Sequence, residues 1–451
     1  MIERLPKLVV AGGILAVAAA AFFAAWIRPF YFTNQTILGG LLLLELLVAT
    51  IFSYRRFFFP ALLLVFLFAG LNLPFKGIWI QARWLFLGSG AFVGCIVLLK
   101  EWALSFRLFH IVAIFSIFAC LMSATVSRRS DVASLKAISV LLLFVYAGTG
   151  ARLAFARSEP NFLQGLRTGS EILIVFVGIL YGLGIQVLGN PNSLGAVMCF
   201  LSPMLLWWLL FDQDTHFRSL HVGLFVLCFI LLVYSRSRAG LLAAACSCTL
   251  LCLCLRRYRV FATGLVAFAI LTSAIGIVRP EFIRSFGGEI VYKREELGQG
   301  FWASREEPWA KSIKLIKGHR WFGVGIGTTA ENSTRAEEPI LFASSGEVNS
   351  ENGSSYLSLL SGVGIIGAIP YSLLTLILIA KVGRTLIFMW QTRSPHSSAV
   401  PFAIVIVSCL IHALFEDWLM APGNYLCVFF WIFAFILVDV APKTQAANTS
   451  Y

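Results

Sequence analysis

Charged residues are scarce in this sequence. Asp, Glu, Lys and Arg make up only 13% of its 451 residues, whereas soluble globular domains carry about 25%. Hydrophobic residues reach 59%, and the mean hydropathy is +0.85. This scarcity excludes an ordinary water-soluble fold. Because a helix needs roughly 20 apolar residues to cross a bilayer and such stretches recur along the chain, we predict a polytopic membrane protein.

Several motifs of catalysis and cofactor binding are missing as well. The sequence has no Ser, His and Asp in triad order, no phosphate-binding P-loop and no Cys-x-x-Cys. All ten cysteines fall inside apolar segments. Four of them cluster at Cys246, Cys248, Cys252 and Cys254, but at helical pitch their thiols spread round the axis. We therefore interpret the cysteines as small hydrophobic residues and not as metal ligands.

The net charge of +13 does not indicate a nucleic-acid partner, because Lys and Arg are scattered in pairs between apolar segments and form no basic domain. Two explanations remain open. Positive loops are retained on the cytoplasmic side of a membrane, and an anionic substrate head group on the opposite side would need Arg or Lys. Both can hold together.

Apolar runs between charged or Gly/Pro breaks predict an all-α bundle of about 12–14 transmembrane spans. We expect the first run to be an uncleaved helix, because no convincing cleavage site precedes Arg28. The second, third and sixth runs could instead be re-entrant. The runs lie near 8–27, 36–52, 57–73, 84–99, 108–126, 134–151, 169–188, 193–211, 220–235, 238–255, 260–279, 354–380, 399–415 and 423–440.

The bias of Lys and Arg in short loops predicts a cytoplasmic N-terminus. One pair, Arg128 with Arg129, falls on the outer side by this count, and the sequence leaves open whether spans are miscounted or the pair has a role there. The same count places four polar features on the extracytoplasmic face. They are 189–192, 235–238, a long loop at about 280–352, and 416–418.

Arg236 and Arg238 stand between two spans with almost no loop, and an Arg at membrane depth costs about 2.5–3.5 kcal/mol. Either both side chains reach the interface and merely end a helix, or their planar guanidinium groups bind phosphate oxygens. The same choice arises at Glu351, which is either a carboxylate favoured by a helix dipole or a general base.

The long loop contains its own elements. The spacing of Trp309, Ile313, Ile316 and Trp321 predicts an amphipathic helix on the membrane surface. His319, Arg320 and a glycine run at 323–327 follow it. The run is not a dinucleotide-binding fingerprint, because a helix and not a strand precedes it, and a flexible turn is the simpler interpretation.

A further group of polar residues is predicted on the outer face, near the C-terminal end of the sequence. His412 and Glu416 stand one helical turn apart and are followed by Asp417. This spacing favours an interfacial pair between His412 and Glu416. A zinc site is not indicated, because the sequence offers no evident third ligand.

The order of these features resembles the O-antigen ligase and polymerase superfamily of bacterial polysaccharide assembly. The resemblance covers mainly residues 189–440 and rests on four elements. They are Asn192 before an outer helix, the run from Ser237 to Leu242, Arg305 with Trp309, and the run from Phe322 to Gly327.

This resemblance implies a C-type glycosyltransferase fold in the bacterial inner membrane, with a periplasmic active site. The enzyme would act on a glycan carried by undecaprenyl diphosphate, without a metal or other cofactor. Arg238 and Arg305 would hold the diphosphate as the sugar leaves. Further candidates for substrate binding are Asn192, Arg236, His319, Arg320, Asn352, His412, Glu416 and Asp417.

This sequence departs from the family pattern at one place, and the difference indicates which branch of the family it resembles. Ligases place a His-Asn pair before the helix that re-enters the membrane, whereas this sequence has Glu351-Asn352-Gly353-Ser354. A Glu-x-Gly-x-Ser run followed by an aromatic residue resembles the exopolysaccharide polymerase branch. Glu351 is then the candidate base that activates an acceptor hydroxyl.

We therefore expect N-terminal transmembrane helices at 1–188, a ligase- or polymerase-like region at 189–440 and a short cytoplasmic tail at 441–451. The expected partners are a lipid-linked glycan, an acceptor glycan or lipid, and membrane lipids, but no nucleic acid. The alternatives are a ligase that joins the glycan to lipid A-core or another acceptor, and a transporter of polysaccharide or lipid-linked glycan. Transporters usually show paired repeats and midplane charges, which favours the transferase here.

Overall fold

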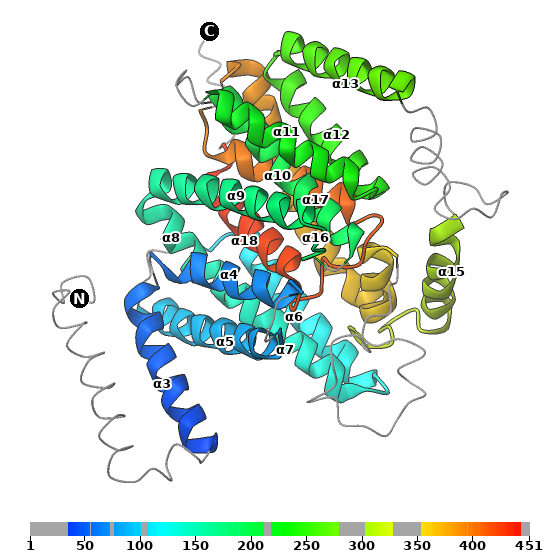
Figure 1. Cartoon of the computed structure of the whole chain (residues 1–451). Coiled ribbons are helices and arrows are strands. Elements are labelled where there is room, and N and C mark those ends of the chain that lie inside the picture. The colour runs from blue at the N-terminus through cyan, green and yellow to red at the C-terminus, as the bar shows by residue number, and fades with distance from the viewer. Residues whose placement is uncertain are drawn as a thin grey trace, which may run out of the picture. The chain divides into compact units, whose positions relative to one another are not determined.

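The computed structural model describes residues 35–54, 56–72, 76–100, 106–188, 190–211, 218–278, 303–327, 353–394 and 396–442. Every regular element within these ranges is a helix (Figure 1). Six helical segments are long and apolar enough to cross a membrane, and six further apolar helices are shorter. The predicted all-α polytopic membrane protein is confirmed. The first predicted span, at 8–27, lies outside the described residues.

The chain divides into two compact units, the first formed by 1–105 and 142–159. It contains α3 (Gln35–Ser53), α4 (Phe58–Gly70), α5 (Lys76–Lys100), the π-helical turn η2 (Ala147–Ala151) and α8 (Arg152–Arg157). The Tyr54 hydroxyl donates to the Gly90 carbonyl at 2.9 Å and lies 2.8 Å from the Thr149 hydroxyl. This buried polar group is therefore satisfied inside an otherwise apolar helix bundle.

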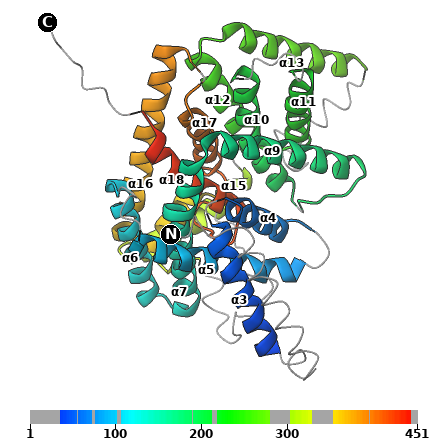
Figure 2. The same cartoon turned by 90° about the vertical axis from the view of Figure 1, so that its left-hand side faces the viewer.

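The second unit comprises 106–141 and 160–451. Its α10, α12 and α17 pack against one another, and α17 packs against α18 (Figure 1 and Figure 2). Nearly every side chain of α10, α17 and α18 is buried, which makes these helices the core of the unit. Its helices are α6 (Leu108–Val126), α7 (Ser130–Tyr146, whose residues from 142 on belong to the first unit), α9 (Glu159–Gly182), α10 (Pro191–Phe211), α11 (Arg218–Tyr234), α12 (Arg238–Cys254), α13 (Tyr258–Val278), α15 (Ala303–Gly318), α16 (Ser355–Thr392), α17 (Ala399–His412) and α18 (Tyr425–Val440).

Two predicted boundaries differ from the observed ones. The span expected at 169–188 begins at Glu159, so polar residues lie inside α9. They are tolerated because Arg167 pairs with Glu171 at 3.1 Å and also contacts His221. The span expected at 354–380 continues to Thr392, because a helix end can carry basic side chains that reach the membrane surface.

Helix α16 is broken near its start, where Gly364 adopts φ 67° and ψ −175°. A break inside an apolar helix leaves backbone groups that must find partners inside the protein. The 319–327 segment supplies them. Val324 N–H donates to Ser361 O at 3.0 Å, and Ile365 N–H donates to Arg320 O at 2.8 Å. The glycine run is therefore a docked segment, and its interpretation as a flexible turn is wrong.

The 319–327 segment also contacts the turn between α6 and α7. The Ser127 hydroxyl donates to Val324 O at 2.7 Å, so Arg128 and Arg129 lie on the face that carries the 319–327 segment. This agrees with the count that separated the pair from the other basic loops. Arg129 forms an ion pair with Asp131 at 3.1 Å, which offsets part of its positive charge.

Candidate functional site

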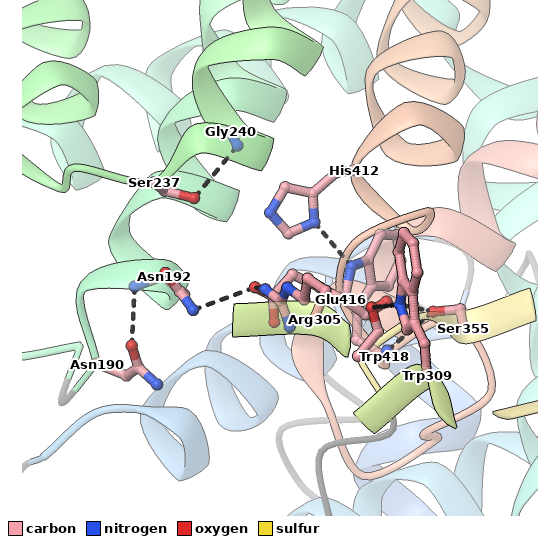
Figure 3. Close-up of polar contacts among 11 residues, drawn as sticks. Asn190, Asn192, Ser237, Gly240, Arg305, Trp309, Ser355, His412, Glu416 and Trp418 are labelled. Carbon is pink, nitrogen blue, oxygen red and sulfur yellow. Dashed lines mark hydrogen bonds and ion pairs between the residues drawn. The ribbon is translucent and has the colours of Figure 1, made fainter. Parts of the chain in front are cut away.

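The close crossing of α10 and α12 sets the geometry of the site. A Cβ on Gly240 would lie 2.9 Å from the carbonyl oxygen of Gly195, so only glycine permits this approach. The Ser237 hydroxyl caps α12 by accepting from the Gly240 N–H at 3.2 Å (Figure 3). The crossing brings the first turn of α10, which carries Asn192, next to the first turn of α12, which carries Arg238.

An ion pair connects these helix ends to α15. Arg305 of α15 pairs with Glu416, and the side chains are only 13% and 15% exposed. The Asn192 amide donates to the same Glu416 oxygen at 3.1 Å (Figure 3). Glu416 therefore joins α10 and α15 through one carboxylate, in a position where water screens the pair less than at an exposed surface.

Ser355, the first residue of α16, holds the backbone of the segment that carries Glu416. Its hydroxyl donates to Glu416 O at 2.7 Å and accepts from the backbone N–H groups of Trp418 and Leu419 at 3.0 and 3.1 Å. Its own N–H donates to Ala413 O at 3.0 Å. One serine thus fixes the direction in which the segment leaves α17.

His412 lies at the end of α17 and is 1% exposed. Its Nδ1 accepts a hydrogen bond from Trp418 Nε1 at 3.0 Å, and its ring packs edge-on against Phe200 at 5.6 Å. The predicted pair between His412 and Glu416 is wrong. Helix α17 ends at His412, so the chain turns and directs Glu416 to Arg305.

The electrostatics of the site favour an anion. Arg305 lies within electrostatic range of both Arg238 and His412. The N-termini of α10 and α12, which carry partial positive charge, lie beside these side chains. Helix N-termini combined with guanidinium groups bind phosphate and carboxylate groups well. In the described structure, Glu416 is the carboxylate that contacts Arg305.

In a comparison with known protein families, residues 223–372 match a family model described as O-antigen ligase. The resemblance to the O-antigen ligase and polymerase superfamily is confirmed. No curated protein gives a significant match. The activity associated with the O-antigen ligase family is that of a membrane glycosyltransferase in the ligase and polymerase class, and the multi-pass helical structure agrees with it.

The O-antigen ligase match covers some of the site residues and not others. It includes Arg238 and Arg305, whereas Asn192, His412 and Glu416 lie outside it. Those three reach the site because α10 and the segment after α17 pack beside the matched region. The site therefore extends beyond the residues that match the O-antigen ligase family model.

Glu351 and Asn352 lie outside the described residues. The next residue in the chain, Gly353, has a φ of 67° and packs against α15. Its carbonyl accepts from Trp309 Nε1 at 3.1 Å. Because Trp309 is one turn from Arg305, this hydrogen bond connects the helix that carries Arg305 to the entry of α16, and both lie within the matched residues 223–372.

The other predicted site residues within the described part of the chain are exposed or partly exposed. Arg236 is exposed in a left-handed turn at φ 53°. The side chains of His319 and Arg320 are exposed, while their carbonyls accept hydrogen bonds that hold the docked segment. Asp417 is partly exposed next to Glu416.

Sequence reasoning missed the organising role of two residues. Ser355 and Trp418 hold Glu416 and His412 in place. The only available signal for Ser355 was its position in a Ser-Ser pair at a helix start, where serine commonly bonds backbone groups.

Proposed function

We propose that this protein polymerises a bacterial surface polysaccharide or exopolysaccharide. It would transfer glycan from undecaprenyl diphosphate to an acceptor hydroxyl on the extracytoplasmic face of the inner membrane. The observation that carries the proposal is the convergence of Arg238 and Arg305 on the helix N-termini beside Asn192. A group of guanidinium side chains and helix ends, in which the Arg305 side chain is only 13% exposed, is suited to a diphosphate.

The reaction is a single displacement at the anomeric carbon. The acceptor hydroxyl oxygen forms a bond to that carbon, the bond from carbon to the diphosphate oxygen breaks, and the lipid diphosphate leaves with the electron pair. Arg238 and Arg305 stabilise the negative charge that develops on the leaving group. Inversion at the anomeric carbon follows from the single displacement. No metal is required, because the two guanidinium groups supply the positive charge.

Glu416 has a defined part in this scheme. Its carboxylate occupies Arg305 in the described structure, so a diphosphate that binds Arg305 competes with it. Asn192, which donates to the same carboxylate, becomes available to the incoming anion at the same time. The ion pair thus balances the charge of Arg305 before substrate arrives, and it holds the Arg305 side chain in position to bind the substrate.

Glu351 is the proposed base that accepts the proton of the acceptor hydroxyl. Its sequence setting supports a polymerase, since a ligase would have a His-Asn pair there. The second candidate is an O-antigen ligase that joins finished glycan to lipid A-core or another acceptor, and the description of the matching family favours it. Arg236, His319, Arg320, Asn352 and Asp417 remain predicted substrate contacts.

Glycan analysis of a deletion strain complemented with wild-type protein or with Glu351→Gln tests this function. A polymerase that uses Glu351 leaves single lipid-linked repeats and no long chains in both the deletion strain and the variant. Polymer of normal length that stays on the undecaprenyl carrier identifies a ligase. An unchanged glycan profile contradicts both activities and favours a transporter. Glu307→Gln is the matched control, because Glu307 is 77% exposed and pairs only locally with Lys311.

A further inference from the structure

His412 carries a buried polar atom that the proposed reaction has not used. Its Nε2 is inaccessible to solvent, and within the described ranges no hydrogen-bond partner reaches it. Buried side-chain donors and acceptors are almost always paired in native proteins. Among the described residues, four other buried side-chain atoms also lack a hydrogen-bond partner, but His412 Nε2 is the one of these five that lies beside Arg305, where a bound ligand can satisfy it.

The tautomer of His412 follows from its neighbour. An indole nitrogen can only donate a hydrogen bond, so Trp418 Nε1 donates and Nδ1 of His412 accepts at 3.0 Å. The accepting nitrogen carries no proton. In the neutral ring the hydrogen must then be on Nε2, which makes that atom a donor.

The surroundings of the ring keep it neutral and indicate what it binds. Arg305 lies within electrostatic range, so a positive charge on the imidazole would be repelled. Phe200 covers the ring with an apolar edge. In Figure 3 the Nε2 edge faces the side on which Ser237 and Asn192 lie, where α12 and α10 begin. A donor that faces two helix N-termini, with an arginine within electrostatic range, is complementary to an anionic oxygen.

We propose that His412 binds the substrate as a neutral Nε2–H donor to an oxygen of the anionic group held by Arg238 and Arg305. This inference rests on the proposed function, because the anion is the diphosphate of the lipid-linked glycan. His412 is accordingly a binding residue and does not accept the proton of the acceptor hydroxyl. Trp418 acts through it as a positioning residue, because its N–H occupies the only other nitrogen of the ring.

Two substitutions distinguish a binding role of His412 from a role as a base and from a purely structural role. In His412→Asn, the amide oxygen replaces Nδ1 as acceptor for Trp418, but nothing reaches the position of Nε2. In His412→Gln, the longer amide carries a donor to about that position. Neither side chain can act as a base. The measurements are the dissociation constant of inorganic pyrophosphate for the purified full-length protein, the turnover rate, and the melting temperature in the same detergent.

We expect His412→Asn to keep its melting temperature and to bind pyrophosphate about 10-fold more weakly, which is the typical effect of one lost hydrogen bond to a charged group. We expect His412→Gln to stay within about 3-fold of wild type. Equal affinity of the Asn variant and wild type overturns the inference. Normal pyrophosphate affinity of both variants with abolished turnover also overturns it, because that pattern identifies a base.

Nitrogen NMR of the histidine rings gives an independent test. The His412 signals, assigned by their loss in His412→Asn, should show a protonated Nε2 and an unprotonated Nδ1 across pH 6–8. A protonated Nδ1 contradicts the assignment of the tautomer. Arg305→Gln distinguishes a failure of the proposed function from a failure of the role assigned to His412. If it weakens pyrophosphate binding and His412→Asn does not, the proposed function stands and only the role of His412 is wrong, whereas wild-type protein that does not bind pyrophosphate contradicts both.

Discussion

Arg305 and Glu416 form an ion pair across 111 positions of sequence. Both charged side chains are mostly buried, and each also interacts with another group of the site. Arg305 interacts electrostatically with Arg238 and His412, while Glu416 accepts from Asn192. The pair therefore couples the loop helix α15 to the ends of α10 and α17, and its energetics bear on both folding and substrate binding.

Replacing Arg305 tests this coupling. Arg305→Gln removes a charge that stabilises the leaving diphosphate, so we expect turnover to fall by about 100-fold or more. Arg305→Lys keeps the charge but not the planar fork, and we expect an intermediate loss. Initial rates with purified protein measure both effects. Lys311→Gln is the control on the same helix, because Lys311 is 60% exposed, and a comparable loss there would contradict a specific role for Arg305.

Ser355→Ala should destabilise the protein. The substitution leaves the buried N–H groups of Trp418 and Leu419 without the hydroxyl that accepts from them. Each such donor costs roughly 1–3 kcal/mol, so we expect the free energy of unfolding to fall by about 2–6 kcal/mol for the two donors. Denaturant titration in detergent measures it. Ser139→Ala is the matched control, since the half-buried Ser139 donates an exposed hydrogen bond to the carbonyl four residues earlier, and it should leave stability unchanged.

Gly323→Ala should undock the segment at 319–327. Gly323 has a φ of 70°, and a Cβ there would collide with the backbone of Gly362 and Gly364. We expect a loss of about 3 kcal/mol in the free energy of unfolding. Gly184 shares the left-handed conformation at φ 79° but has open space around it, so Gly184→Ala isolates the conformational cost of about 1 kcal/mol. Equal losses in the two variants would show that the segment is not docked.

Gly240→Ala should separate α10 from α12. The added methyl group would press on the carbonyl of Gly195, and overpacking of this kind costs about 1–3 kcal/mol. Because Arg238 lies half a turn away, we also expect weaker binding of pyrophosphate. Thermal unfolding and pyrophosphate titration measure the two effects. On α13, Gly264→Ala meets no neighbouring atom and should preserve both stability and binding.

The helices were predictable because their signal is local. A span is an apolar run of sufficient length, and α6 therefore occupies the predicted residues 108–126. A helix in the long loop was also predicted from local spacing, and α15 runs from Ala303 to Gly318, although Trp321, which was counted on its apolar face, lies beyond its end. The break at Gly364 was not predicted, because it depends on hydrogen bonds to a segment about 40 positions earlier.

Sequence alone determined the membrane setting, the helical class and the family resemblance of the region that holds Arg238 and Arg305. These depend on composition and on short runs of neighbouring residues. Only the tertiary structure decided that Glu416 pairs with Arg305 and not with His412, and that Trp418 occupies one nitrogen of His412. The reason is physical, because the turn after α17 is set by hydrogen bonds to Ser355, and contacts between distant segments leave no periodic signal in the chain.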